Sequence, residues 1–377
     1  MPLNPLVAPS PISLPRASAV PRVGGRLRDL MARERVFVLL LAAGFAAAAM
    51  VFRTPEIAMW FGFAVAAYSV VANDSIQTIG TFIASNKDQK WWVLWLFIGG
   101  IFVLTIGASW LNYGGDVTNQ RLASKGFGEA PTEFSYLQIA APLFLLLLTR
   151  LRMPVSTTFL LLSSFATTAS SVGSILSKSL LGWALAFGAA FAVWFALSRV
   201  LDRWFVGTPH PAWRVGQWIT SGLLWSVWVM QDAANIAVYL PRSLSLLEVL
   251  VFVGVVFLGL GVLFRSGGER VQKVVDEKSK VVDVRSATVI DLVYAAVLYY
   301  FKVYSNVPMS TTWVFIGLLG GRELAMALRG SSGLSVRQAA RMMGKDLLYV
   351  SIGLLVSLLI AYSVNDAFRG EIHSMFG

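Results

Sequence analysis

Cysteine is absent from this sequence of 377 residues, and histidine occurs only at positions 210 and 373. Without cysteine there are no disulfides and no thiolate metal sites. Two histidines leave little scope for histidine-based catalysis or metal ligation. Charged residues are also scarce, at 14% of the chain, whereas hydrophobic residues make up 56%. Soluble domains carry about a quarter charged residues. The composition therefore predicts an all-α polytopic membrane protein with about 10 to 12 membrane segments of roughly 20 residues or less.

The net charge of +11 would indicate nucleic-acid binding in a soluble protein. Here the basic residues lie mostly between apolar runs, where Lys and Arg set topology and meet anionic lipid. We therefore expect the lipid bilayer as a partner and no nucleic acid. Residues 1–35 contain six prolines and six arginines but no apolar core ahead of the arginines, so they predict a disordered cytoplasmic tail. We expect the protein to lie in the cell (inner) membrane and to cross it several times.

Two short stretches, Pro154-Val155-Ser156-Thr157-Thr158 and Pro308-Met309-Ser310-Thr311-Thr312, each follow one long apolar run and open another. Proline ends a helix, and a Ser or Thr can cap the next one. Helix N-termini carry unpaired N–H groups and partial positive charge, which attract anions. Ordinary capping would explain one copy. Two copies favour broken helices whose caps face each other across an oxyanion site formed by Ser156, Thr157, Thr158, Ser310, Thr311 and Thr312.

Two polar clusters interrupt other apolar runs. The first contains Asn73, Asp74 and Gln77, and the second contains Gln231, Asp232 and Asn235. A charged Asp in hydrocarbon costs at least ~3 kcal/mol, so it normally faces a cavity or a partner. Three explanations are open: binding of Na⁺ by oxygen ligands, protonation of the Asp, or ion pairing with Lys or Arg. Recurrence of the cluster without an adjacent cation favours a coupling ion.

We also expect the first cluster to interrupt its helix, and residues 265–285 to form a charged loop.

Asp291 is an isolated carboxylate in a third apolar segment. It is a candidate for additional ion coupling, and a structural hydrogen bond to another helix explains it equally well.

The two halves of the chain repeat this order of features. Asp74 and Asp232 are 158 positions apart, and Pro154 and Pro308 are 154 apart. Gly114-Gly115 recurs as Gly267-Gly268, a step of 153. Matches in the same order at nearly constant spacing indicate an internal repeat. The expected organisation is a tail (1–35), an extra transmembrane helix (36–56), a first repeat (57–200), a linker (201–214), a second repeat (215–365) and a C-terminal tail (366–377). Repeats with interrupted membrane segments are typical of secondary transporters.

Together these motifs resemble the inorganic phosphate transporter (PiT) family of cation-coupled anion symporters. That family carries a G-A-N-D-V-A-N-A-like motif early in each half and P-V-S-T-T-H at each re-entrant hairpin. The first resembles residues 71–78 and 231–235 of this chain, and the second resembles residues 154–158 and 308–312. The resemblance covers roughly residues 57–365. Departures are Val71, Gln77 and Gln231 in the first motif, and Phe159 and Trp313 where the family has His.

The resemblance implies an inverted-repeat transporter with two re-entrant, broken-helix hairpins. It further implies that Asn73, Asp74, Asp232 and Asn235 bind the coupling cation, Na⁺ or H⁺, and that the Ser-Thr-Thr positions bind phosphate. We expect cation-coupled phosphate symport by alternating access, with no enzymatic activity, no cofactor beyond the coupling ion, and a homodimer as a candidate assembly. Sulfate or another oxyanion as substrate, and a non-transporting anion sensor or assembly subunit, remain open alternatives.

Overall fold

The computed structural model describes residues 34–124, 126–151, 155–204, 207–278, 283–331 and 334–376, and their regular structure is entirely helical. Residues 1–33 of the expected tail and Pro154 lie outside the described residues. The helices in chain order are α2 (Arg35–Val51), α3 (Pro55–Ser85), α4 (Trp91–Asn112), α5 (Tyr136–Arg150), α6 (Thr157–Leu160), the 3-10 helix η1 (Leu162–Phe165), α7 (Ala169–Trp204), α8 (Ala212–Ala237), α9 (Leu246–Lys278), α10 (Val284–Tyr304), α11 (Thr311–Arg329), α12 (Val336–Val364) and α13 (Asp366–Phe376).

Six of these helices contain a stretch long and apolar enough to cross a membrane. They are α3, α4, α7, α9, α10 and α12, and two shorter apolar helices, α2 and α5, accompany them. The chain is therefore an all-α, multi-pass integral membrane protein, as expected from its composition. The finer expectation of 10 to 12 segments would also need shorter or more polar helices, such as α8 and α11, and stays a prediction.

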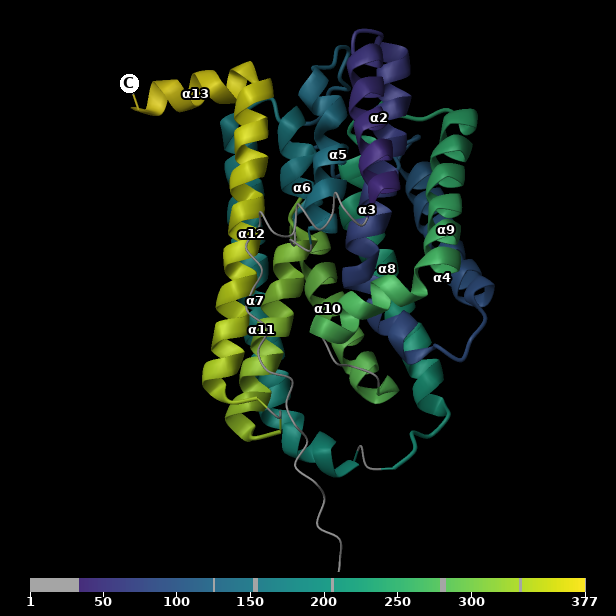
Figure 1. Cartoon of the computed structure of the whole chain (residues 1–377), viewed down its shortest axis with the longest axis vertical. Coiled ribbons are helices and arrows are strands. Elements are labelled where there is room, and N and C mark those ends of the chain that lie inside the picture. Colours follow the sequence, from purple (N-terminus) through teal and green to yellow (C-terminus); the bar gives the residue numbers. More distant parts are fainter. Residues whose placement is uncertain are drawn as a thin grey trace, which may run out of the picture.

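The long helices run roughly side by side along the long axis of the molecule (Figure 1). Helix α12 lies at one side, α4 and α9 lie at the other, and α13 projects sideways from the end of α12, away from the other helices. The most extensive packing joins α7 to α11 and α8 to α10, while α3 packs against α5, α8 and α9. Helices from the two halves of the sequence are thus interleaved, and the polar segments described below lie between them.

The contact between α7 and α11 is close because glycines line it. A Cβ atom at Gly317 would lie 2.3 Å from the carbonyl oxygen of Trp183, and one at Gly321 would lie 2.2 Å from that of Phe187. Both separations are far below van der Waals contact, so only glycine fits. Small residues at helix contacts are a general device for bringing membrane helices together.

Two expectations from the sequence are wrong. The Asn73–Asp74 cluster does not interrupt its helix, since α3 continues from Pro55 to Ser85. Residues 265–278 are helical and not a loop, because α9 extends to Lys278. Neither stretch contains proline, and the polar residues of both stretches are compatible with helical backbone hydrogen bonding. Polar residues within an apolar run therefore did not mark helix breaks at these two places.

Candidate functional site

The two Ser-Thr-Thr triplets begin helices, as expected. Ser156 is the N-cap of α6, where its hydroxyl accepts a hydrogen bond from the Phe159 N–H (3.2 Å). Ser310 is the N-cap of α11 and accepts from the Trp313 N–H (3.4 Å). All six residues of the two triplets are buried, with at most 2% of their surface exposed. Their side chains therefore have to find partners inside the protein.

The two caps contact each other reciprocally. The Thr158 hydroxyl donates to the carbonyl oxygen of Met309, the residue before Ser310 (3.2 Å). In turn, the Thr312 hydroxyl donates to the carbonyl oxygen of Val155, the residue before Ser156 (3.4 Å). Segments 157 positions apart in sequence are thus joined in the core. The sequence predicted that the caps would face each other, and this exchange of hydrogen bonds places them so.

The first polar cluster lies against the first cap. Asp74, on α3, is fully buried and accepts from the Asn73 amide (2.6 Å), the Thr157 hydroxyl (2.8 Å) and more distantly the Gln77 amide (3.4 Å). The Asn73 amide also donates to the Val155 carbonyl oxygen (3.0 Å). This carboxyl group is held by neutral donors. None of the ion pairs found in the described residues involves Asp74, which argues against the ion-pairing explanation.

The second polar cluster reaches both caps. The Asn235 amide on α8 donates to Asp232 (2.6 Å) and to the hydroxyls of Thr157 (3.0 Å) and Thr158 (3.3 Å). The Thr311 hydroxyl also lies beside Asp232. Gln231 points elsewhere, because its amide donates to the Leu298 carbonyl oxygen on α10 (3.0 Å). Helices α3 and α8 therefore bring two carboxyl groups to the same pair of caps.

Asp74 and Asp232 lie within electrostatic range of each other. Two buried carboxylates so placed repel, so the pair needs a proton or a cation to be stable. Several buried oxygens in the clusters also lack a hydrogen-bond partner among the described residues. They are Gln77 Oε1, Gln231 Oε1, Asp232 Oδ2 and Asn235 Oδ1. Buried polar atoms are nearly always paired, so the unpaired acceptors on Gln77, Asp232 and Asn235, near the two carboxyl groups, require a partner such as a water or a cation.

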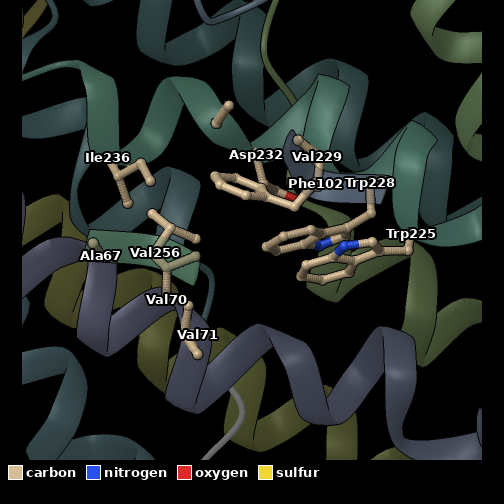
Figure 2. Close-up of a pocket in the computed structure, with 11 residues that line it drawn as sticks. Ala67, Val70, Val71, Phe102, Trp225, Trp228, Val229, Asp232, Ile236 and Val256 are labelled. Atoms are coloured by element: carbon tan, nitrogen blue, oxygen red, sulfur yellow. The ribbon is translucent and has the colours of Figure 1, made fainter. Parts of the chain in front are cut away.

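A small cavity adjoins Asp232 (Figure 2). Its volume of about 20 Å³ is enough for a single water-sized species. The stacked rings of Trp225 and Trp228, whose centroids are 4.7 Å apart, form part of its wall, and apolar side chains of α3, α4 and α9 complete it. Asp232 is the one ionisable group in this lining. Figure 2 shows its side chain among these apolar groups, and the surface that lines the space is apolar, so the cavity has no polar partner for a water or an ion among the described residues.

The structure does not bring Asp291 to the caps. Its two carboxylate oxygens accept from the hydroxyls of Thr81 (2.7 Å) on α3 and Ser221 on α8. Ser221 accepts in turn from Gln217, and Gln217 accepts from Asn86 at the end of α3. Asp291 thus belongs to a separate buried network that ties α10 to α3 and α8. This arrangement favours the structural explanation of Asp291 over additional coupling.

The sequence reasoning missed three residues at the site. Tyr294, on α10, donates to the Thr311 carbonyl oxygen (3.0 Å). Arg121, in the loop between α4 and α5, donates to the carbonyl oxygen of Ser305, and Lys178, on α7, donates to the same oxygen (2.9 Å). A lysine inside the apolar run of α7 was a usable signal. Nothing in the sequence indicated that an arginine from a polar loop would be buried here.

Comparison by sequence gives no assignment, because no family model and no curated protein matches this chain. Comparison of structures gives a match in fold. A solved structure of a sodium-dependent phosphate transporter matches with a TM-score of 0.54 and 16% sequence identity, over 84% of this chain and 98% of that one. The chain therefore has the fold of a sodium-dependent phosphate transporter, which confirms at the level of fold its resemblance to the inorganic phosphate transporter family.

Proposed function

We propose that this protein is a cation-coupled symporter of a tetrahedral oxyanion, with inorganic phosphate as the first candidate substrate. The anion would bind between the two caps, to hydroxyl and backbone N–H groups of residues 156–158 and 310–312. The cation would bind at the carboxyl pair formed by Asp74 and Asp232. The observation that carries the proposal is the joining of both sets of groups: Thr157 donates to Asp74 and accepts from Asn235, so the cap and both clusters form one hydrogen-bonded unit.

The unpaired oxygens favour Na⁺ as the coupling ion. A proton needs a single acceptor, whereas Na⁺ needs several hard oxygen ligands. The clusters offer unpaired oxygens on Gln77, Asp232 and Asn235 in addition to the hydroxyls of the caps. Binding of Na⁺ would offset the repulsion between the carboxyl groups and supply positive charge beside the anion. Coupling follows, because each ion then binds better when the other is present.

Phosphate is favoured over sulfate by the presence of acceptors in the same unit. At neutral pH phosphate carries at least one O–H group, which needs an acceptor, whereas sulfate carries none. Asp232 Oδ2 is buried and unpaired, and the Thr158 and Thr311 hydroxyls lie beside the same carboxyl group. Transport would proceed by rocking of one half, residues 57–200, against the other, residues 215–365, so that the site opens to each side in turn. We propose that the halves form an inverted repeat with two re-entrant hairpins.

The test is uptake into liposomes that contain only the purified protein. Labelled phosphate and labelled sulfate are each supplied with an inward Na⁺ gradient, an inward H⁺ gradient, or neither. We expect phosphate to accumulate above its equilibrium level with the Na⁺ gradient. Accumulation of sulfate alone would reassign the substrate, and accumulation with H⁺ alone would reassign the coupling ion. Absence of uptake of either anion under every gradient would leave the anion sensor or assembly subunit as the better explanation.

A further inference from the structure

Among the buried charged residues that the structure describes, Arg121 has the most side-chain nitrogens without a hydrogen-bond partner. It comes from the loop between α4 and α5, and none of its surface is exposed. One guanidinium nitrogen, Nη1, donates to the Ser305 carbonyl oxygen. Both Nε and Nη2 are buried and have no hydrogen-bond partner among the described residues. Leaving the donors of a buried charge unpaired is unfavourable, so a ligand for them is expected.

The two unpaired nitrogens lie on one edge of the guanidinium plane. Nε–H and Nη2–H point in the same direction and form the fork that binds two oxygens of a phosphate, sulfate or carboxylate group. Capping the end of α10 explains the bond to Ser305, since that residue is the C-cap of the helix. It does not explain a free fork on the other edge.

The fork lies close to the second cap. Arg121 is within electrostatic range of Asp232 and of Lys178. Lys178 donates to the carbonyl oxygens of Ser305 and Val307, in the segment that leads into Ser310. The next residue on α7, Ser179, accepts from the Ser310 N–H (2.8 Å). Two cationic side chains thus converge on Ser305 and Val307, in the segment that leads into the cap. Asp232, the carboxyl group within range of Arg121, offsets at most one of these two like charges.

We propose that Arg121 binds the transported oxyanion through its Nε–Nη2 fork, with Lys178 adding positive charge beside it. This inference rests on the proposed function and deepens it. Arg121 adds a fixed positive charge to a site otherwise made of hydroxyl and amide donors. The site then selects ligands that present two oxygens and carry a full negative charge. Phosphate and sulfate share this chemistry, and the anion is held by a salt bridge in addition to neutral hydrogen bonds.

The test compares anion binding by full-length variants in detergent with saturating Na⁺. Arg121→Gln removes the charge and the fork, and Arg121→Lys keeps the charge without the fork. Arg242→Gln is the matched control. Arg242 is also a largely buried loop arginine, but its three nitrogens donate to the backbone carbonyl oxygens of Phe127, Leu240 and Glu129, at 2.9, 2.7 and 2.7 Å. Binding of labelled phosphate and of labelled sulfate is measured together with thermal unfolding with and without Na⁺.

We expect Arg121→Gln to raise the Kd of the bound anion at least tenfold and Arg121→Lys to raise it less, while Na⁺ still stabilises both variants against heat. Arg242→Gln should lower the unfolding temperature and leave Kd unchanged. If the wild-type protein binds the anion and Arg121→Gln binds it with the same Kd, the role of Arg121 is overturned and the proposed function is not. If Arg121→Gln does not fold, wild-type affinity in Arg121→Lys would overturn it. Absence of anion binding by the wild-type protein would overturn this inference and the proposed function together.

Discussion

The Thr157 hydroxyl is the single group that joins the first carboxyl cluster, the second cluster and a cap. It donates to Asp74 Oδ2 (2.8 Å) and accepts from the Asn235 amide (3.0 Å). Thr157→Val keeps the size and shape of the side chain and removes both bonds. Asp74 then keeps the donors on Asn73 and Gln77, of which the Gln77 amide lies 3.4 Å away. We expect this change to weaken Na⁺ binding far more than it weakens the fold.

The magnitude follows from the oxygen that is lost, because the Thr157 hydroxyl is one of the cap hydroxyls proposed as Na⁺ ligands. A polar contact to a charged group contributes about 1.5–3 kcal/mol, and 1.4 kcal/mol is a factor of ten, so the half-saturating Na⁺ concentration should rise roughly 10- to 150-fold. Thr157→Ser keeps the hydroxyl and should stay within about threefold of the wild type. The assay is anion uptake into liposomes over a series of Na⁺ concentrations, with the unfolding temperature in detergent measured on the same preparations.

Thr78→Val is the matched control. Thr78 is as deeply buried as Thr157, each with 1% of its surface exposed, and its hydroxyl also bonds to Asp74, but to the backbone carbonyl oxygen (3.0 Å). This local bond leaves the carboxyl group untouched, so the Na⁺ dependence of uptake should not change. Equal Na⁺ dependence in Thr157→Val and Thr78→Val would refute the reasoning, because the effect would then not come from the carboxyl group.

Other changes give equally direct expectations. Asp74→Asn should abolish Na⁺-dependent uptake without preventing membrane insertion, whereas Asp232→Asn should keep a Na⁺ dependence because the Arg121 guanidinium already lies within electrostatic range of Asp232. The same uptake assay separates the two variants, and Na⁺-dependent uptake by Asp74→Asn would remove that residue from coupling. Gly317→Ala should destabilise the protein by about 1–3 kcal/mol through overpacking against α7. Gly188→Ala adds a methyl group in open space on the same helix α7 and should not lower the unfolding temperature, because alanine favours the helix. Asp291→Asn should lower the unfolding temperature and keep the wild-type dependence on Na⁺, and a lost dependence would make Asp291 a coupling residue after all.

Duplication is what made the core of the site predictable. A single Ser-Thr-Thr triplet or a single buried Asp has ordinary explanations, but both features recur in the same order in each half. The structure brings those duplicated residues together through the Thr158–Met309 and Thr312–Val155 contacts. Composition likewise predicted the all-α membrane architecture, since helices satisfy every backbone polar group inside a bilayer.

The remaining features depend on tertiary packing, which leaves little trace in local sequence. A polar cluster in an apolar run was expected to break α3, yet the helix continues. Asn73 and Asp74 find hydrogen-bond partners in the residues around the first cap, so their polar side chains are satisfied without a break in the helix. The loop that carries Arg121 has the composition of an ordinary surface connection. The burial of Arg121 depends on the end of α10, whose Ser305 carbonyl oxygen lies beside it.

The two halves of the site differ in charge although their motifs repeat. Asp232 has the Arg121 guanidinium within electrostatic range, whereas Asp74 is held by neutral donors alone. A repeat with equivalent halves would need a cation at each carboxyl group. Here a resident arginine partly offsets the charge of Asp232, so under the proposed function the transported cation would be needed mainly at Asp74. Since Thr157 links Asp74 to Asn235 and through it to Asp232, a cation that entered beside Asp74 would also change the hydrogen bonding of the proposed anion site. The unequal charge of the halves is therefore a physical basis for coupling cation entry to anion binding.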